Sequence, residues 1–157
     1  MSVQYDVDAG MLPTAAMLRR WVKAAQELDM EVVVRFAGTR EARTLNAVFR
    51  GKEYATNVLT FVYDDVLPLA GDIVLCAPVL RREARGRGKT LAEHCAHLVV
   101  HGTLHLQGYD HHTVRAARKM EARESAILSR LGIADPYAGS QAGRSSRAIK
   151  PPRSAGG

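Results

Sequence analysis

Residues 90–111 read TLAEHCAHLVVHGTLHLQGYDH, and this stretch decides both the centre of the expected fold and its chemistry. Thr90 is a typical helix N-cap, and the segment that follows is apolar on nearly every side as far as Gln107. A helix that is apolar all round has to be covered by the rest of the domain. We therefore expect residues 90–107 to form a buried central helix.

All six histidines of the chain lie between positions 94 and 112, and three of them have the spacing H-x3-H-x5-H. His101 and His105 are four residues apart, so on a helix they project from one face, offset by about 6 Å along the axis. Gly108 follows one turn later, where a left-handed residue would end the helix and turn the chain back. This reversal can bring His111 to the same ion.

Three neutral imidazoles leave a tetrahedral cation one open position, which is the arrangement of catalytic rather than structural sites. Nickel, cobalt and copper accept such ligands as well as zinc does. We interpret His94 and His97, which fall on the same helical arc, as histidines of the core or beside the ligands. His112 is an alternative third ligand, and Asp110 either orients a ligand histidine or caps the next helix.

Helix and strand patterns alternate along the rest of the chain. We expect strands at 3–7, 30–37, 58–63 and 72–76, the last two as an antiparallel pair, and helices at 14–28, 40–50, 78–85, 90–107 and 114–131. In the second helix Thr39 is the expected N-cap, and four apolar residues should face inward: Ala42, Leu45, Val48 and Phe49. The sum is a single α+β domain with a mixed four-stranded sheet and about five helices.

Composition sets the limits of that domain. The 157 residues are 46% hydrophobic, which suits one globular domain at 1–135. Residues 136–157 are rich in Gly, Ser, Pro and Arg, and we expect a basic, disordered tail. Cys76 and Cys95 are expected as buried apolar residues. No segment resembles a signal peptide or a membrane span, so we expect a cytoplasmic protein with no membrane contact.

The formal net charge of +6 suggests a polyanionic partner. Inside the predicted domain, one cluster of basic residues at 81–89 contains a single acidic residue, Glu83. Its members are candidates for RNA binding: Arg81, Arg82, Arg85, Arg87 and Lys89.

A helical H-x3-H also occurs in zinc peptidases, where H-E-x-x-H places a glutamate beside the first ligand as general base. Gly102 occupies that position here, so peptide hydrolysis would lack its proton acceptor. Phosphodiester hydrolysis fits better, because a metal can polarise a phosphoryl oxygen or supply hydroxide. Such chemistry calls for a cation near the phosphate, and Arg50, at a predicted helix end, is the candidate catalytic residue.

Three segments together resemble the YbeY family of bacterial metal-dependent endoribonucleases. They are LNAVFRGKEYATNVLTF at 45–61, GDI at 71–73 and the histidine run at 101–111, with matching order and spacing over about residues 40–135. Where many members continue with Ser-Phe-Pro, this chain has Thr60-Phe61-Val62.

The resemblance implies an endoribonuclease that acts on single-stranded RNA, matures the 3′ end of small-subunit ribosomal RNA and serves in ribosome quality control. Its partners would be ribosomal RNA and the small ribosomal subunit. It further implies one Zn²⁺ per chain, held by His101, His105 and His111, with Arg50 as the principal active-site residue that is not a ligand.

Several alternatives stay open at this stage. The protein could be a metal-stabilised RNA-binding factor of ribosome assembly with no chemistry of its own. In an enzyme, either water or the ribose 2′-hydroxyl could be the nucleophile. Glu121 and Glu124 are interpreted as solvated helix residues, and Asn57 and Thr60 either contact the RNA backbone or serve the local fold.

Overall fold

The computed structural model describes residues 1–64 and 66–137. Its elements, in chain order, are β1 (Ser2–Tyr5), α1 (Ala15–Ala25), β2 (Met30–Ala37), α2 (Thr39–Arg50), β3 (Val58–Asp64), β4 (Leu69–Cys76), α3 (Ala77–Gly86), α4 (Leu91–Leu106) and α5 (Val114–Arg130). The expected α+β class is confirmed, and the predicted tail lies almost wholly outside the described residues.

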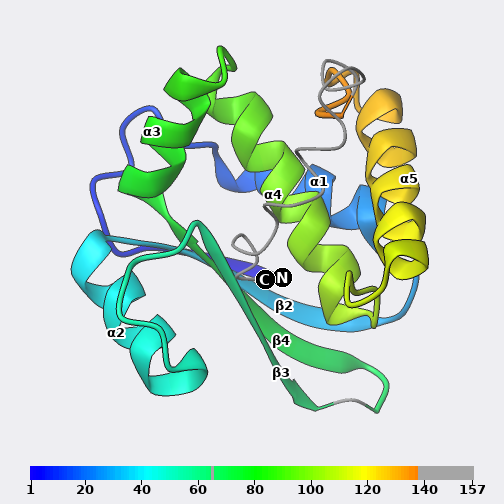
Figure 1. The fold of residues 1–157 in the computed structure, drawn as a ribbon, viewed down its shortest axis with the longest axis horizontal. Helices are drawn as coiled ribbons and strands as arrows, with labels where there is room; N and C mark the ends of the chain where they lie inside the picture. The colour runs from blue at the N-terminus through cyan, green and yellow to red at the C-terminus, as the bar shows by residue number, and fades with distance from the viewer. Residues whose placement is uncertain (65, 138–157) are drawn as a thin grey trace.

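The four strands form one mixed sheet in the order β1-β2-β4-β3 (Figure 1). β2 pairs in parallel with β1 and with β4, whereas β3 and β4 form the predicted antiparallel pair. Successive side chains along each strand point to opposite faces of the sheet. Ile73 lies in the main core, and its neighbour Val74 packs on the other side with Leu59.

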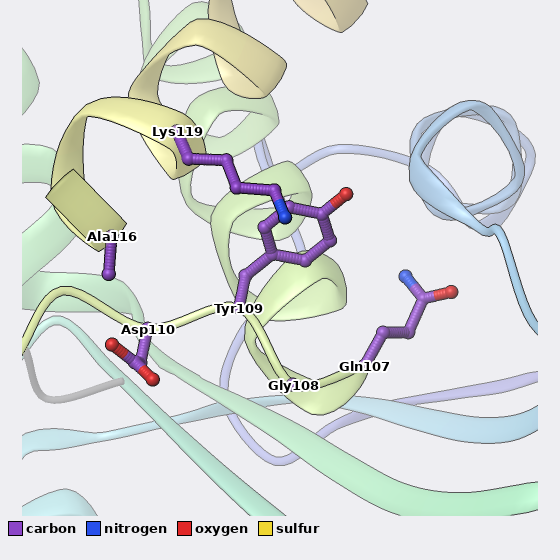
Figure 2. Close-up of a pocket in the computed structure, with 6 residues that line it drawn as sticks. All are labelled: Gln107, Gly108, Tyr109, Asp110, Ala116 and Lys119. Atoms are coloured by element: carbon purple, nitrogen blue, oxygen red, sulfur yellow. The ribbon is translucent and has the colours of Figure 1, made fainter.

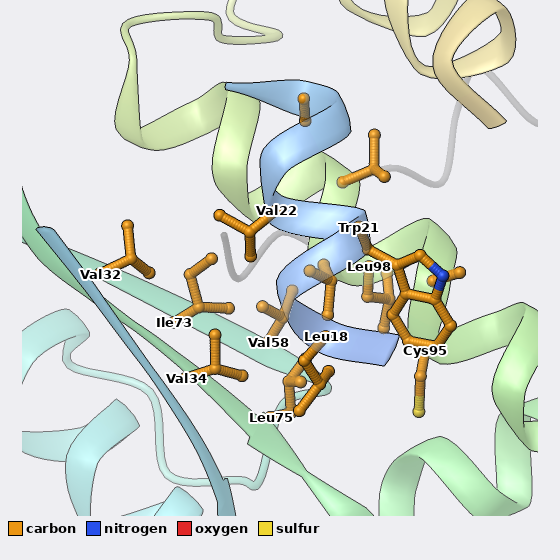
Figure 3. Packing of buried hydrophobic residues seen from close by; sticks show 14 of the residues in the cluster. Leu18, Trp21, Val22, Val32, Val34, Val58, Ile73, Leu75, Cys95 and Leu98 are labelled. Carbon is orange, nitrogen blue, oxygen red and sulfur yellow. The ribbon is translucent and has the colours of Figure 1, made fainter. Parts of the chain in front are cut away.

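The main core lies between the sheet and the helices α1 and α4. Ten of the 16 residues of α4 are buried, as expected of a central helix. Thr90 caps this helix through a capping box, in which its hydroxyl accepts from the Glu93 backbone N–H and the Glu93 carboxylate accepts from the Thr90 N–H. Figure 3 shows Trp21 of α1 and Leu98 of α4 packed together in this core.

The opposite face of the sheet carries α2, and here two predictions were wrong. Val48 and Phe49 were expected to face inward, but they are 67% and 63% exposed. The face that α2 covers is narrow, and the buried residues of α2 are Ala42 and Asn46, whose side-chain amide donates to the Tyr54 carbonyl. Thr39 was expected to be the N-cap, and this was also wrong: Gly38 is the N-cap, and Thr39 is the first residue of the helix.

The last turns of α4 approach the sheet very closely at two glycines. A Cβ on Gly71 of β4 would lie 2.5 Å from the Phe61 carbonyl oxygen and 2.9 Å from Leu106 Cδ2. A Cβ on Gly102 of α4 would lie 3.2 Å from Ile73 Cγ2. These positions place the histidine end of α4 directly against β3 and β4.

Candidate metal centre

Three histidine rings form a nearly equilateral triangle at the C-terminal end of α4. The ring centroids are 6.2 Å apart for His101 and His105, 6.0 Å for His101 and His111, and 6.1 Å for His105 and His111. The three histidines selected by the H-x3-H-x5-H spacing therefore lie together in the structure. Within residues 1–64 and 66–137, no group of three or more His, Cys, Asp or Glu side chains is arranged so that it could hold a metal ion as it stands.

Gly108 makes the turn that brings His111 back to the helix. Its φ of +104° lies in the region that glycine favours, and the Gly108 N–H donates to the His105 carbonyl at 3.0 Å. The Tyr109 N–H then donates to the Leu104 carbonyl at 3.2 Å. The helix thus ends where the sequence predicted, and the chain reverses.

Gln107 fastens this turn to the end of α1 with four hydrogen bonds. Its Oε1 accepts from the backbone N–H groups of Glu27 and Leu28, at 2.6 and 2.8 Å. Its Nε2 donates to the carbonyls of Ala25 and Thr103, both at 2.9 Å. Because every donor and acceptor of the amide is used, Gln107 fixes the position of the turn rather than contacting a ligand.

Two of the three rings have their Nδ1 atoms already engaged. His105 Nδ1 lies 2.8 Å from the Tyr109 carbonyl oxygen, and His101 Nδ1 lies 2.6 Å from Glu124 Oε2. Carbonyl and carboxylate oxygens can only accept, so each Nδ1 carries the proton. In the neutral ring Nε2 is then left with its lone pair, which is the form that binds a cation.

Glu124 was expected to be solvated, and this prediction was wrong. It is fully buried, and besides His101 it contacts His97 Nε2 at 3.1 Å and accepts from the Tyr137 hydroxyl. Burial alone would raise the pKa of Glu124, but the charges and hydrogen bonds of His101 and His97 outweigh it, so the pKa is lowered. Tyr137 lies two residues past the predicted domain boundary.

The surroundings favour the neutral form of two of the predicted ligands. Burial, followed by the neighbouring histidines, lowers the pKa of His105 and of His111, although His111 is the more exposed of the two. Neutral imidazole is the species that coordinates metals. Burial also lowers the pKa of His97, which faces Glu124 and not the triangle.

The remaining histidines have other surroundings. His94 is 3% exposed, and its Nε2 lies 2.8 Å from Glu83 Oε1, in keeping with the expected core position. The same Glu83 accepts from the amide of Asn57, which is buried, as a role in the local fold requires. His112 is exposed, with its ring stacked on His111 at a centroid distance of 6.0 Å.

Asp110 lies in the connection between α4 and α5, residues 107–113, which we call the metal-side turn. Its Oδ1 accepts from the His112 N–H at 3.0 Å. Of the two roles considered for Asp110, capping of the next helix was wrong, because Thr113 is the N-cap of α5 and accepts from the Ala116 N–H.

The predicted cationic residues come from α2, from α3 and from the turn before α4, whereas the triangle is built by α4 and the turn that follows it. Arg50 is the exposed last residue of α2, the helix on the sheet face opposite α4. The cluster Arg81–Lys89 lies on α3 and in the turn before α4, at the opposite end of α4 from His105 (Figure 1). Within this cluster Arg82, Arg85 and Arg87 are exposed.

Comparison with known proteins supplies the family. Residues 8–132 match the family model described as Endoribonuclease YbeY. The chain belongs to the YbeY endoribonuclease family. The match includes His101, His105, His111 and Arg50, together with Glu124.

Individual YbeY proteins are similar over most of their length. The chain is 54% identical over 137 residues to the Endoribonuclease YbeY of Nitrosomonas europaea, covering 87% of this chain and 84% of that protein. It is 52% identical over 139 residues to that of Thiobacillus denitrificans, covering 87% and 95%. The solution structure of TM1509 from Thermotoga maritima is 26% identical, with a TM-score of 0.53 and coverage of 98% and 99%.

Membership of the YbeY family makes the protein an RNA-cleaving hydrolase and confirms the resemblance found in the sequence. In the described part of the chain, no helix combines the length and apolar character needed to cross a bilayer.

Proposed function

We propose that this protein is a zinc-dependent endoribonuclease that cuts single-stranded RNA, with one Zn²⁺ held by His101, His105 and His111. The observation that carries the proposal is the triangle of rings. In two of these rings Nδ1 makes a hydrogen bond, so that Nε2 is available to bind the ion. When bound, the ion supplies a Lewis acid for the phosphoryl group. To hold the ion, the three side chains would have to lie closer together than they do here.

The residues beside the proposed ligands do not suit peptide hydrolysis. Gly102 leaves no carboxylate where a zinc peptidase has its general base, and Ile73 and Thr60 fill the space that a longer side chain would need. Arg50 is proposed to bind the reacting phosphate, because a guanidinium matches phosphate oxygens with two parallel hydrogen bonds. The attacking group is water or the ribose 2′-hydroxyl.

The substrate that we propose is ribosomal RNA, specifically the 3′ end of the small-subunit RNA, with a further role in ribosome quality control in the cytoplasm. Membership of the YbeY family supports this assignment. Mapping of 3′ ends in cells depleted of the protein tests it. Extended small-subunit RNA is expected, and normal 3′ ends would contradict it.

The catalytic proposal is tested with a pair of histidine variants. His105→Ala removes a proposed ligand, whereas His112→Ala removes an exposed neighbour outside the triangle. We expect His105→Ala to lose both bound zinc, measured by elemental analysis, and cleavage of an unpaired oligoribonucleotide. His112→Ala should keep both. Equal cleavage by His105→Ala and the wild type would refute a metal-dependent reaction at this site.

The same experiment separates the enzyme from an RNA-binding assembly factor without chemistry. Such a factor would bind the oligoribonucleotide with zinc present and leave it intact in wild-type and variant alike. Family membership favours the enzyme.

A further inference from the structure

A basic face lies on the first turns of α5, directly after the metal-side turn. Arg115, Arg118 and Lys119 are all exposed, and their i, i+3, i+4 spacing puts them on one side of the helix. No acidic residue occurs between Thr113 and Met120. The N-cap of α5 is only two residues past His111, so this face begins beside the histidine triangle.

A hollow of about 320 Å³ lies between the basic face and the metal-side turn (Figure 2). It is lined by Gln107, Gly108, Tyr109, Asp110, Ala116 and Lys119. Lys119 Nζ is 5.7 Å from the centroid of the Tyr109 ring. The Tyr109 carbonyl holds His105 and Asp110 directly precedes His111, so the hollow shares a wall with the proposed metal site.

The three cations are not used by ion pairs within the described part of the chain. The Arg pairs found there join Arg35 to Asp6 and Glu41, and Arg123 to Glu27. The one carboxylate lining the hollow, that of Asp110, accepts from the His112 backbone N–H. The charge on this face is therefore available to an anion.

The α3 cluster that the sequence singled out is much farther from the triangle. α4 has 16 residues and so measures about 24 Å, with Lys89 just before its start and His105 in its last turn. A strand of RNA held on α3 would reach the histidines only after crossing most of this length. The α5 face needs no such span.

We propose that Arg115, Arg118 and Lys119 bind the phosphates of the unpaired RNA strand next to the bond that is cut, with the adjoining nucleotide entering the hollow beside Tyr109. Guanidinium groups bind phosphate through paired hydrogen bonds, and the lysine adds a point charge. This inference rests on the proposed function, since it names how that site holds its substrate.

Two triple variants with the same loss of charge test it. One is Arg115→Gln/Arg118→Gln/Lys119→Gln on α5, and the other is Arg82→Gln/Arg85→Gln/Arg87→Gln on α3. Affinity for a short unpaired 2′-O-methyl oligonucleotide is measured against salt concentration. Each lost phosphate contact makes the slope of log K against log salt less negative by about 0.7, so the α5 variant should change it by roughly 2. The α3 variant should stay near the wild-type slope.

The proposal is overturned if the α5 variant keeps the wild-type slope, or if the α3 variant alone changes it. Zinc content and circular dichroism serve as controls, because all six substituted residues are exposed. In cleavage of natural RNA, the α5 variant should raise KM at least tenfold with kcat within about threefold. If the wild type binds with the expected slopes but cleaves nothing, the proposed catalysis fails while the α5 binding surface stands.

Discussion

Glu124 is the residue on which the orientation of His101 depends. A carboxylate with no exposed surface is costly unless its oxygens are satisfied, and here His101, His97 and Tyr137 satisfy them. The result is a carboxylate–histidine pair of the kind that fixes a metal ligand in one tautomer. Glu124 therefore acts on the proposed metal site through His101, without being one of its proposed ligands.

Glu124→Gln should weaken zinc binding by about 10- to 100-fold, because the amide cannot hold His101 as an ionised carboxylate does. Zinc affinity is measured by competition with a chromophoric chelator. The matched control is Glu121→Gln, which makes the same change at an exposed position of the same helix and should leave the affinity unchanged. Equal affinities for Glu124→Gln and wild type would remove Glu124 from the site.

Cys95 is expected to be chemically inert in the folded protein. Burial raises its pKa to about 12, so at pH 8 roughly one thiol in ten thousand is the reactive thiolate. Labelling with iodoacetamide should therefore be negligible in native protein and complete after denaturation. The direction of the effect follows from desolvation. Burial disfavours the charged thiolate, so the pKa rises and the thiolate fraction at a given pH falls. Rapid native labelling at Cys95, located by peptide mapping, would show that the helix opens.

The histidine triangle could be predicted from sequence because helix geometry and one glycine turn fix it locally. Glu124 could not be assigned to it, because its partner His101 lies 23 residues away and the meeting depends on how α4 packs on α5. One signal was present: Glu124 falls on the same helical stripe as the buried residues Met120, Ile127 and Leu128. A charged residue on an apolar stripe needs a buried partner.

At the scale of elements, the close contact of α4 with the sheet explains why Gly71 is a glycine. Gly71→Ala should destabilise the fold by about 1–3 kcal/mol, because the new methyl group meets a backbone carbonyl that cannot move away and a Leu106 methyl. Urea unfolding measures the loss.

Gly86→Ala is the control for this substitution. A Cβ at Gly86, in the last turn of α3, meets nothing within 4 Å, so alanine should be neutral or slightly stabilising. If the two variants unfold at the same urea concentration, the packing of α4 on β4 is looser than these distances imply.

Helix α2 shows where pattern reading fails. Its apolar positions predicted an inward face that included Val48 and Phe49, but the strip of sheet beneath it is small and Asn46 takes a buried place. Phe49 instead meets Phe61 edge-on, with ring centroids 5.1 Å apart. Periodicity indicates which residues share a face, but the width of the surface opposite decides how many of them are covered.

At the scale of the whole molecule, the sequence predicted the class of sheet but not its order. The placement of β4 between β2 and β3 joins residues far apart in the chain, such as Val34 and Ile73. The same topology puts the α3 cluster at one end of α4 and the α5 basic face at the other. The α3 cluster could be found from the clustering of charge in the sequence. That the α5 basic face lies next to the histidines could be found only from the fold.

Zinc should stabilise the whole domain, because the ligands come from α4 and from the turn into α5, and these pack on α1 and the sheet. At a free zinc concentration 100 times the dissociation constant, the expected gain is about 2.7 kcal/mol. For a chain of this size that corresponds to an increase in Tm of roughly 5–10 °C, measured by differential scanning calorimetry. His112→Ala should keep this increase, and His105→Ala should lose it. An equal increase in His105→Ala would place the zinc outside the triangle.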